Sequence, residues 1–90
     1  MDQAEKLVVA LENAMKDYIK GERDDVRAFL LGVSEEVAQI ATVPDLSKRQ
    51  EMLEEVKARF LVMKEKHRIR AVRKGWQTFD LVIRVLVEAL

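Results

Sequence analysis

Apolar residues recur along the chain at the three- and four-residue steps of an amphipathic helix, first in residues 2–20 and again in residues 24–42. Gly21 follows the first stretch directly, where a helix end with positive φ favours glycine. Asp24 or Asp25 is placed to cap the second helix, and Pro44 ends it by forcing Val43 out of the helical region. Two helices of similar length joined by a tight turn predict an antiparallel hairpin.

The third apolar stretch covers residues 47–90 and contains no proline and a single glycine, at position 75. Ser47 with Gln50 matches a capping box at its start, and Asp45 is a competing cap. One outcome is a long or kinked helix over the whole stretch. The other is a break near residues 74–78, with Thr78 capping a short fourth helix. The apolar periodicity crosses Gly75 without losing phase, which favours the continuous helix.

A heptad-like seam occupies the end of this stretch, where apolar residues alternate at steps of three and four. It consists of Ile69, Val72, Trp76, Phe79, Ile83, Leu86 and Leu90. An earlier stripe, Leu53, Val56, Phe60 and Met63, lies about 150° away round an ideal helix. A straight helix cannot bury both against one neighbour, so the seam is predicted to contact a second copy or a partner helix. In the alternative, the chain folds back near Gly75 and the seam is core.

Composition agrees with helices: 49% of the residues are hydrophobic, 36% are charged, and there are only one proline and three glycines. The fold class predicted is all-α, a small helical bundle in a single domain over residues 1–90. Cysteine is absent, which excludes disulfides and thiolate metal sites. The sequence shows neither a signal peptide nor an apolar run as long as a membrane span, so we expect a cytoplasmic protein without membrane contact.

Charge is balanced overall but unevenly distributed along the chain. Residues 1–45 hold ten acids and five bases, whereas residues 46–90 hold six acids and eleven bases. Basic residues that share a broad helical face are candidates for contact with anions or nucleic acid: Arg59, Lys66, Arg70, Arg73, Lys74 and Arg84. No aromatic residue is interleaved on that face for base stacking, and a solvated surface explains the pattern equally.

Candidate chemistry is sparse. His67 is the only histidine, and it stands in a basic run without the carboxylates or further ligands that a metal site or a general base needs. The paired acids point about 100° apart on a helix and do not converge. We therefore expect no metal and no cofactor. The predicted function is a non-enzymatic protein–protein interaction module of adaptor, accessory or inhibitor type, expected to be a homodimer. Nucleic-acid binding is the alternative, and a small all-α enzyme the third hypothesis.

Overall fold

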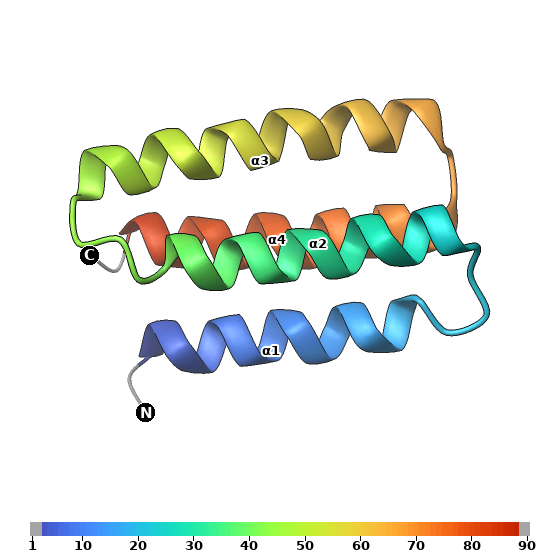
Figure 1. The fold of residues 1–90 in the computed structure, drawn as a ribbon, viewed down its shortest axis with the longest axis horizontal. Coiled ribbons are helices and arrows are strands. Elements are labelled where there is room, and N and C mark those ends of the chain that lie inside the picture. Colours follow the sequence, from blue (N-terminus) through green and yellow to red (C-terminus); the bar gives the residue numbers. More distant parts are fainter. Residues whose placement is uncertain (1–2, 89–90) are drawn as a thin grey trace.

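Four helices account for residues 3–88, the part of the chain that the computed structural model describes. They are α1 (Gln3–Tyr18), α2 (Asp24–Ile40), α3 (Leu46–Lys66) and α4 (Arg70–Glu88). The helices alternate in direction, so that the turns after α1 and α3 lie at one end and the turn after α2 lies at the other (Figure 1). The prediction of an all-α bundle that begins with a helical hairpin is confirmed, with four helices in place of three.

The chain turns back between α3 and α4, at residues 67–69. His67 leaves the helical region with φ −118° and ψ 99°, and α4 begins at Arg70. The prediction of one helix over residues 47–90 is therefore wrong, and so is a break at residues 74–78, because Gly75 lies inside α4. The break explains the change of apolar phase: the two stripes belong to two separate helices, and each helix turns its own stripe inward.

The core lies along the bundle axis and centres on Phe60 of α3. The ring of Phe60 lies 5.1 Å from that of Phe29, 5.5 Å from that of Trp76 and 5.2 Å from that of Phe79, measured between centroids. Phe60 and Phe79 are fully buried. Aromatic contacts in these tilted and edge-to-face geometries add to the stabilisation that burial of the rings provides. The cluster sets α3 against α4 and brings Phe29 of α2 to the same centre.

Gly75 allows α4 to approach this core closely. A Cβ atom at this position would lie 2.8 Å from Leu30 Cδ2 and 3.3 Å from both Met15 Sδ and Phe60 Cζ. Side chains of three other helices thus converge on the glycine. Gly32, the other glycine inside a helix, has nothing within 4 Å of the same position. A close helix contact is therefore found at Gly75 and not at Gly32.

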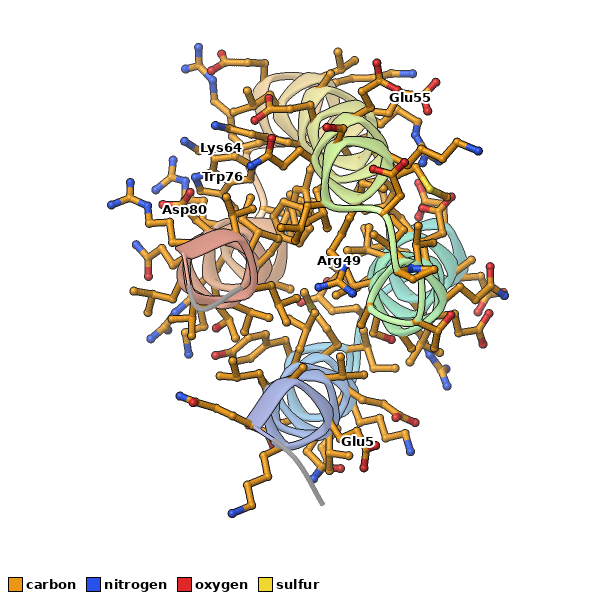
Figure 2. All side chains as sticks on the ribbon, turned by 90° about the vertical axis from the view of Figure 1, so that its left-hand side faces the viewer. Glu5, Arg49, Glu55, Lys64, Trp76 and Asp80 are labelled. Carbon is orange, nitrogen blue, oxygen red and sulfur yellow. The ribbon has the colours of Figure 1, made fainter. Side chains whose placement is uncertain are left out.

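Local polar interactions fix the turns. Gly21 has φ 77°, as predicted for the end of α1. Asp45 caps α3 by accepting from the backbone N–H groups of Ser47 and Lys48 at 2.9 and 3.3 Å. Arg49 points into the end of the bundle (Figure 2) and donates to the carbonyls of Ala41 and Val43 at 2.6–3.2 Å. A buried guanidinium therefore closes the α2–α3 turn by satisfying carbonyls that the helix end leaves free.

Candidate interaction surface

The predicted interface seam lies in the core of its own chain. Val72, Phe79, Ile83 and Leu86 are buried, and Ile69 and Trp76 pack against the core while remaining partly exposed. Leu90 lies outside the described residues. The seam is therefore not available for the predicted homodimer or partner helix. The physical reason is the turn at residues 67–69, which brings α4 back along α1 and α3, and these neighbours cover the seam.

The predicted basic face is divided between two sides of the bundle. Arg59 points from α3 toward α2 and forms an ion pair with Glu36 at 2.8 Å. The remaining cations are exposed at the end of α3 and along α4: Lys66, Arg70, Arg73, Lys74 and Arg84. Lys74 lies over the ring of Tyr18 of α1 at 5.9 Å, and Arg84 pairs with Asp80 of its own helix at 3.1 Å. The basic surface that remains belongs mainly to α4.

A stripe of two carboxylates with an apolar centre runs along α3. Glu54, Ala58, Leu61 and Glu65 follow one another at steps of four, three and four residues, which places them on one side of the helix. All four are exposed, and Leu61 retains 38% of its accessible surface. Leu61 lies roughly 60° round the helix from Lys64, whose Nζ lies 5.6 Å from the centroid of Trp76 of α4. The stripe therefore flanks α4, on the side away from Arg59.

A complementary stripe of cations runs along α4. Arg70, Arg73, Gln77 and Arg84 are exposed and follow at steps of three, four and seven residues. Arg73 lies roughly 60° round the helix from Trp76, which faces α3, whereas Thr78 bonds to Tyr18 of α1 on the other flank at 2.9 Å. In Figure 2 the side chains of Lys64, Trp76 and Asp80 lie between α3 and α4 on this side of the bundle. We call the two stripes with Trp76 between them the α3–α4 face.

Most charges of the α3–α4 face have no partner among the described residues. The side chains of Glu54, Glu65 and Arg73 form no hydrogen bond or ion pair within residues 3–88, and Arg84 is held only by Asp80. Lys57 and Lys64 lie nearer α4 on the inner edge of α3 and are half-buried. The outer edge of the face thus presents acids on α3 and bases on α4. Lys57, Lys64 and Asp80 line its inner edges, with Leu61 and half-buried Trp76 at the centre.

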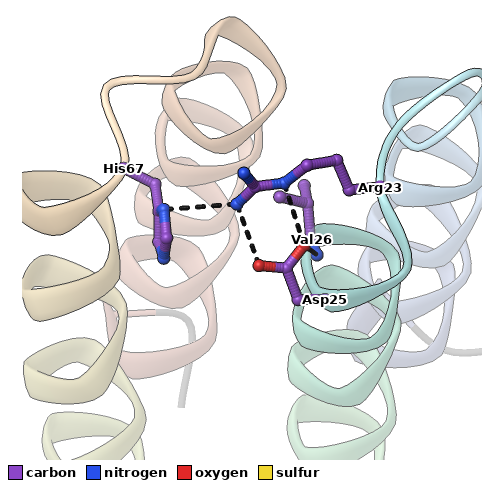
Figure 3. Close-up of polar contacts among 4 residues, drawn as sticks. All are labelled: Arg23, Asp25, Val26 and His67. Atoms are coloured by element: carbon purple, nitrogen blue, oxygen red, sulfur yellow. Dashed lines mark hydrogen bonds and ion pairs between the residues drawn. The ribbon is translucent and has the colours of Figure 1, made fainter.

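A second polar cluster joins the two turns at one end of the bundle (Figure 3). Arg23 donates two hydrogen bonds to Asp25, at 2.9 and 3.1 Å, and its Nη2 lies 3.4 Å from Nδ1 of His67. Desolvation opposes ionisation of Asp25. The hydrogen bonds from Arg23 and from the Val26 N–H, with the nearby charges of Arg23 and His67, outweigh it and lower the pKa of this carboxyl. Asp25 accepts from Val26 N–H at 2.9 Å, while Arg23 occupies the N-cap position of α2 without capping the helix backbone through its side chain. The cluster holds turns in place.

Grooves elsewhere on the surface lie between neighbouring helices. The groove between α1 and α2 has a volume of about 390 Å³ and is lined largely by alanine and valine. Among the described residues, no group of three or more His, Asp or Glu side chains is placed to hold a metal ion. None of the helices within residues 3–88 combines the length and apolar character required to cross a membrane.

Sequence reasoning missed the acidic half of the α3–α4 face. Glu54 and Glu55 are one of the acid pairs that the sequence predicts not to converge, whereas the neighbours of Glu54 on its own side of the helix lie at steps of three to four residues. The spacing of Glu54, Ala58, Leu61 and Glu65 was visible in the sequence. Its position beside the cations of α4 was not, because that depends on the turn at residues 67–69.

The fold defines the class of protein as a small antiparallel four-helix bundle with short turns. Comparison of the chain with family models, with curated proteins and with solved structures finds no significant match in any of the three.

Proposed function

We propose that this chain is a small non-enzymatic protein–protein interaction module whose binding surface is the α3–α4 face. The observation that supports this proposal is the arrangement of that face, with unpaired acids on α3 and bases on α4 on either side of Leu61 and Trp76. An apolar centre bordered by charges is the usual anatomy of a protein interface. Tryptophan and arginine are also the residues most enriched among those that contribute strongly to binding.

A binding role is further supported by the use of the buried polar groups. Ser34 donates to the carbonyl of Leu31 at 2.8 Å, and Arg49 donates to the carbonyls of the α2–α3 turn. Ser34 and Arg49 are the buried polar or charged residues of the described chain, and both donate hydrogen bonds to backbone carbonyls. We propose that the partner is a protein, either a second copy of this chain in a homodimer or another protein, and that the module acts in the cytoplasm.

Nucleic-acid binding is the second candidate, and the exposed cations of α4 favour it. Lys66, Arg70, Arg73, Lys74 and Arg84 would track a phosphate backbone by charge alone. The carboxylates of Glu54 and Glu65 lie on the adjacent helix and repel phosphate on that flank. Leu61 and Trp76 also gain nothing from a charged backbone. The mixed face therefore fits a protein better than it fits a duplex.

The proposal is tested with a photo-crosslinking amino acid at Gln77, in the centre of the face, expressed in the cells that produce the protein. Asn13, exposed on α1, is the matched control position. We expect a discrete protein adduct from position 77 but not from position 13, and its loss when Arg73→Glu is added. The same products from both positions, or none from position 77, would refute the proposed surface.

The second candidate is tested with a 20-base-pair DNA duplex. Binding that weakens steeply as salt rises, and that Arg70→Glu with Arg73→Glu abolishes, would establish it. Absence of a shift at low salt would remove it.

A further inference from the structure

Resting on the proposed function, we infer that the α3–α4 face binds the same face of a second copy about a two-fold axis parallel to the helices. In that arrangement α3 of one protomer lies on α4 of its partner, and α4 lies on the partner's α3. The contact uses one surface twice and is therefore closed. The positions of the charges along the two helices support this arrangement.

We call two residues level when they lie at the same position along the bundle axis. The aromatic contacts show which residues of α3 and α4 are level. The ring of Phe60 touches those of Trp76 and Phe79, so residue 60 of α3 is level with residues 76–79 of α4. Glu54 precedes Phe60 by about 9 Å along α3, and Arg84 follows Phe79 by about 8 Å along α4, at 1.5 Å per residue. Because α3 and α4 are antiparallel, Glu54 and Arg84 are level.

The other end of the face matches in the same way. Glu65 follows Phe60 by about 8 Å, and Arg73 precedes Trp76 by about 5 Å, with Arg70 about 5 Å further on. Glu65 is thus level with the segment from Arg70 to Arg73. At the centre, Leu61 is level with Trp76 and Gln77, and Ala58 is level with Phe79 and Asp80. A two-fold axis parallel to the helices preserves these levels and sets each α3 residue opposite the α4 residue of its partner.

The charges of the two stripes favour a two-fold axis parallel to the helices over a two-fold axis perpendicular to them. With the axis parallel to the helices, Glu54 meets Arg84 and Glu65 meets Arg73, each pair occurring twice. With the axis in the interface but perpendicular to the helices, α3 meets α3 and α4 meets α4. Glutamates would then oppose glutamates and arginines would oppose arginines, which is unfavourable. Arg84 keeps its bond to Asp80 in the dimer, because a guanidinium has five donors.

The face is small for a contact between two proteins. The molecule measures 35 × 25 × 17 Å. At 1.5 Å per residue, the charged stripes of the face run for about 17 Å along α3, from Glu54 to Glu65, and for about 21 Å along α4, from Arg70 to Arg84. The face therefore occupies only part of the 35 Å length of the molecule, and its contact lies at the small end of protein interfaces. Leu61 and Trp76 supply its apolar centre, and Leu81, 66% exposed, borders the α4 stripe. We therefore expect a reversible dimer that salt weakens.

The test is a charge exchange between two variant chains. One variant carries Glu54→Arg and Glu65→Arg, so that these two positions of α3 become basic like Arg73 and Arg84 of α4. The other carries Arg73→Glu and Arg84→Glu, so that these two positions of α4 become acidic like Glu54 and Glu65 of α3. We expect the wild type to dimerise in sedimentation velocity at low salt. Each variant alone should have a dissociation constant raised about tenfold or more. An equimolar mixture should form the heterodimer, because every opposed pair is then of opposite charge.

Glu35→Arg with Lys6→Glu is the matched control, since both residues are exposed on helices outside the face. It should dimerise like the wild type. Circular dichroism of each variant verifies that it is helical. Trp76 is the only tryptophan, so its emission should shift to shorter wavelength as the wild type, but not either variant alone, is concentrated.

A wild type that stays monomeric up to millimolar concentration, or variants that stay monomeric when mixed, would overturn the two-fold arrangement. The crosslink at Gln77 then separates the two proposals. A heterologous adduct that Arg73→Glu abolishes leaves the proposed function standing without self-association. Failure of both experiments refutes both.

Discussion

Replacement of Gly75 by alanine tests whether the close approach of α4 to the core governs stability. The added methyl group would lie 2.8 Å from Leu30 Cδ2, which is shorter than a van der Waals contact, and 3.3 Å from two further atoms. Leu30, Met15 and Phe60 are all fully buried and cannot move outward without disturbing the core. Gly75→Ala therefore combines a gain in helix propensity with a cost of overpacking.

Gly32→Ala supplies the reference, because nothing lies within 4 Å of the added atom. It should stabilise the protein by about 0.5–1 kcal/mol, the difference in helix propensity between glycine and alanine. Overpacking of a tight core costs about 1–3 kcal/mol. The free energy of unfolding of Gly75→Ala should thus lie about 1–3 kcal/mol below that of Gly32→Ala, and Gly75→Ala alone should be neutral to destabilising.

The measurement is urea denaturation followed by circular dichroism at 222 nm, with the three proteins at the same concentration. Leu30→Val in the Gly75→Ala background removes a methylene from the nearest neighbour and should recover part of the loss through a favourable coupling. An equal stabilisation by Gly32→Ala and Gly75→Ala would show that the core adapts freely. It would refute the view that a glycine is required where three helices converge on α4.

Three further predictions concern polar groups. Arg49→Ala should destabilise the protein by about 2–4 kcal/mol in urea denaturation, because it removes a buried guanidinium that donates to two turn carbonyls; a loss no greater than that of the exposed control Lys48→Ala would contradict this role. Asp45→Ala should lower the free energy of unfolding by about 1 kcal/mol through loss of the α3 cap, whereas Ser47→Ala should change it little. A larger loss in Ser47→Ala than in Asp45→Ala would show that Ser47 is the cap instead. Because the pKa of Asp25 is lowered in the folded state, its ionised form contributes stability above its unfolded pKa, and this contribution is lost as the pH falls through the folded value. The melting temperature of the wild type should therefore fall more steeply below about pH 4 than that of Asp25→Asn, and parallel profiles would show that the bonds from Arg23 contribute nothing.

The first two helices and much of the local chemistry of the turns followed from the sequence alone. Periodicity located α1 and α2, and the need for positive φ located the turn at Gly21. Asp45 was recognised as a candidate cap, although Ser47 was placed first. These features depend on residues within a few positions of one another, so a linear pattern records them.

The turn at residues 67–69 was decided by tertiary packing. The segment His67-Arg68-Ile69 contains neither glycine nor proline, while Gly75, the only evident breaker, is buried in the middle of α4. The sequence recorded a change of apolar phase, and an external neighbour explains such a change as well as a break does. Only the arrangement of α1, α3 and α4 around the seam shows that the chain covers it itself. The same arrangement sets Glu54 and Glu65 beside the arginines of α4, because residues far apart in sequence become neighbours only when the helices pack.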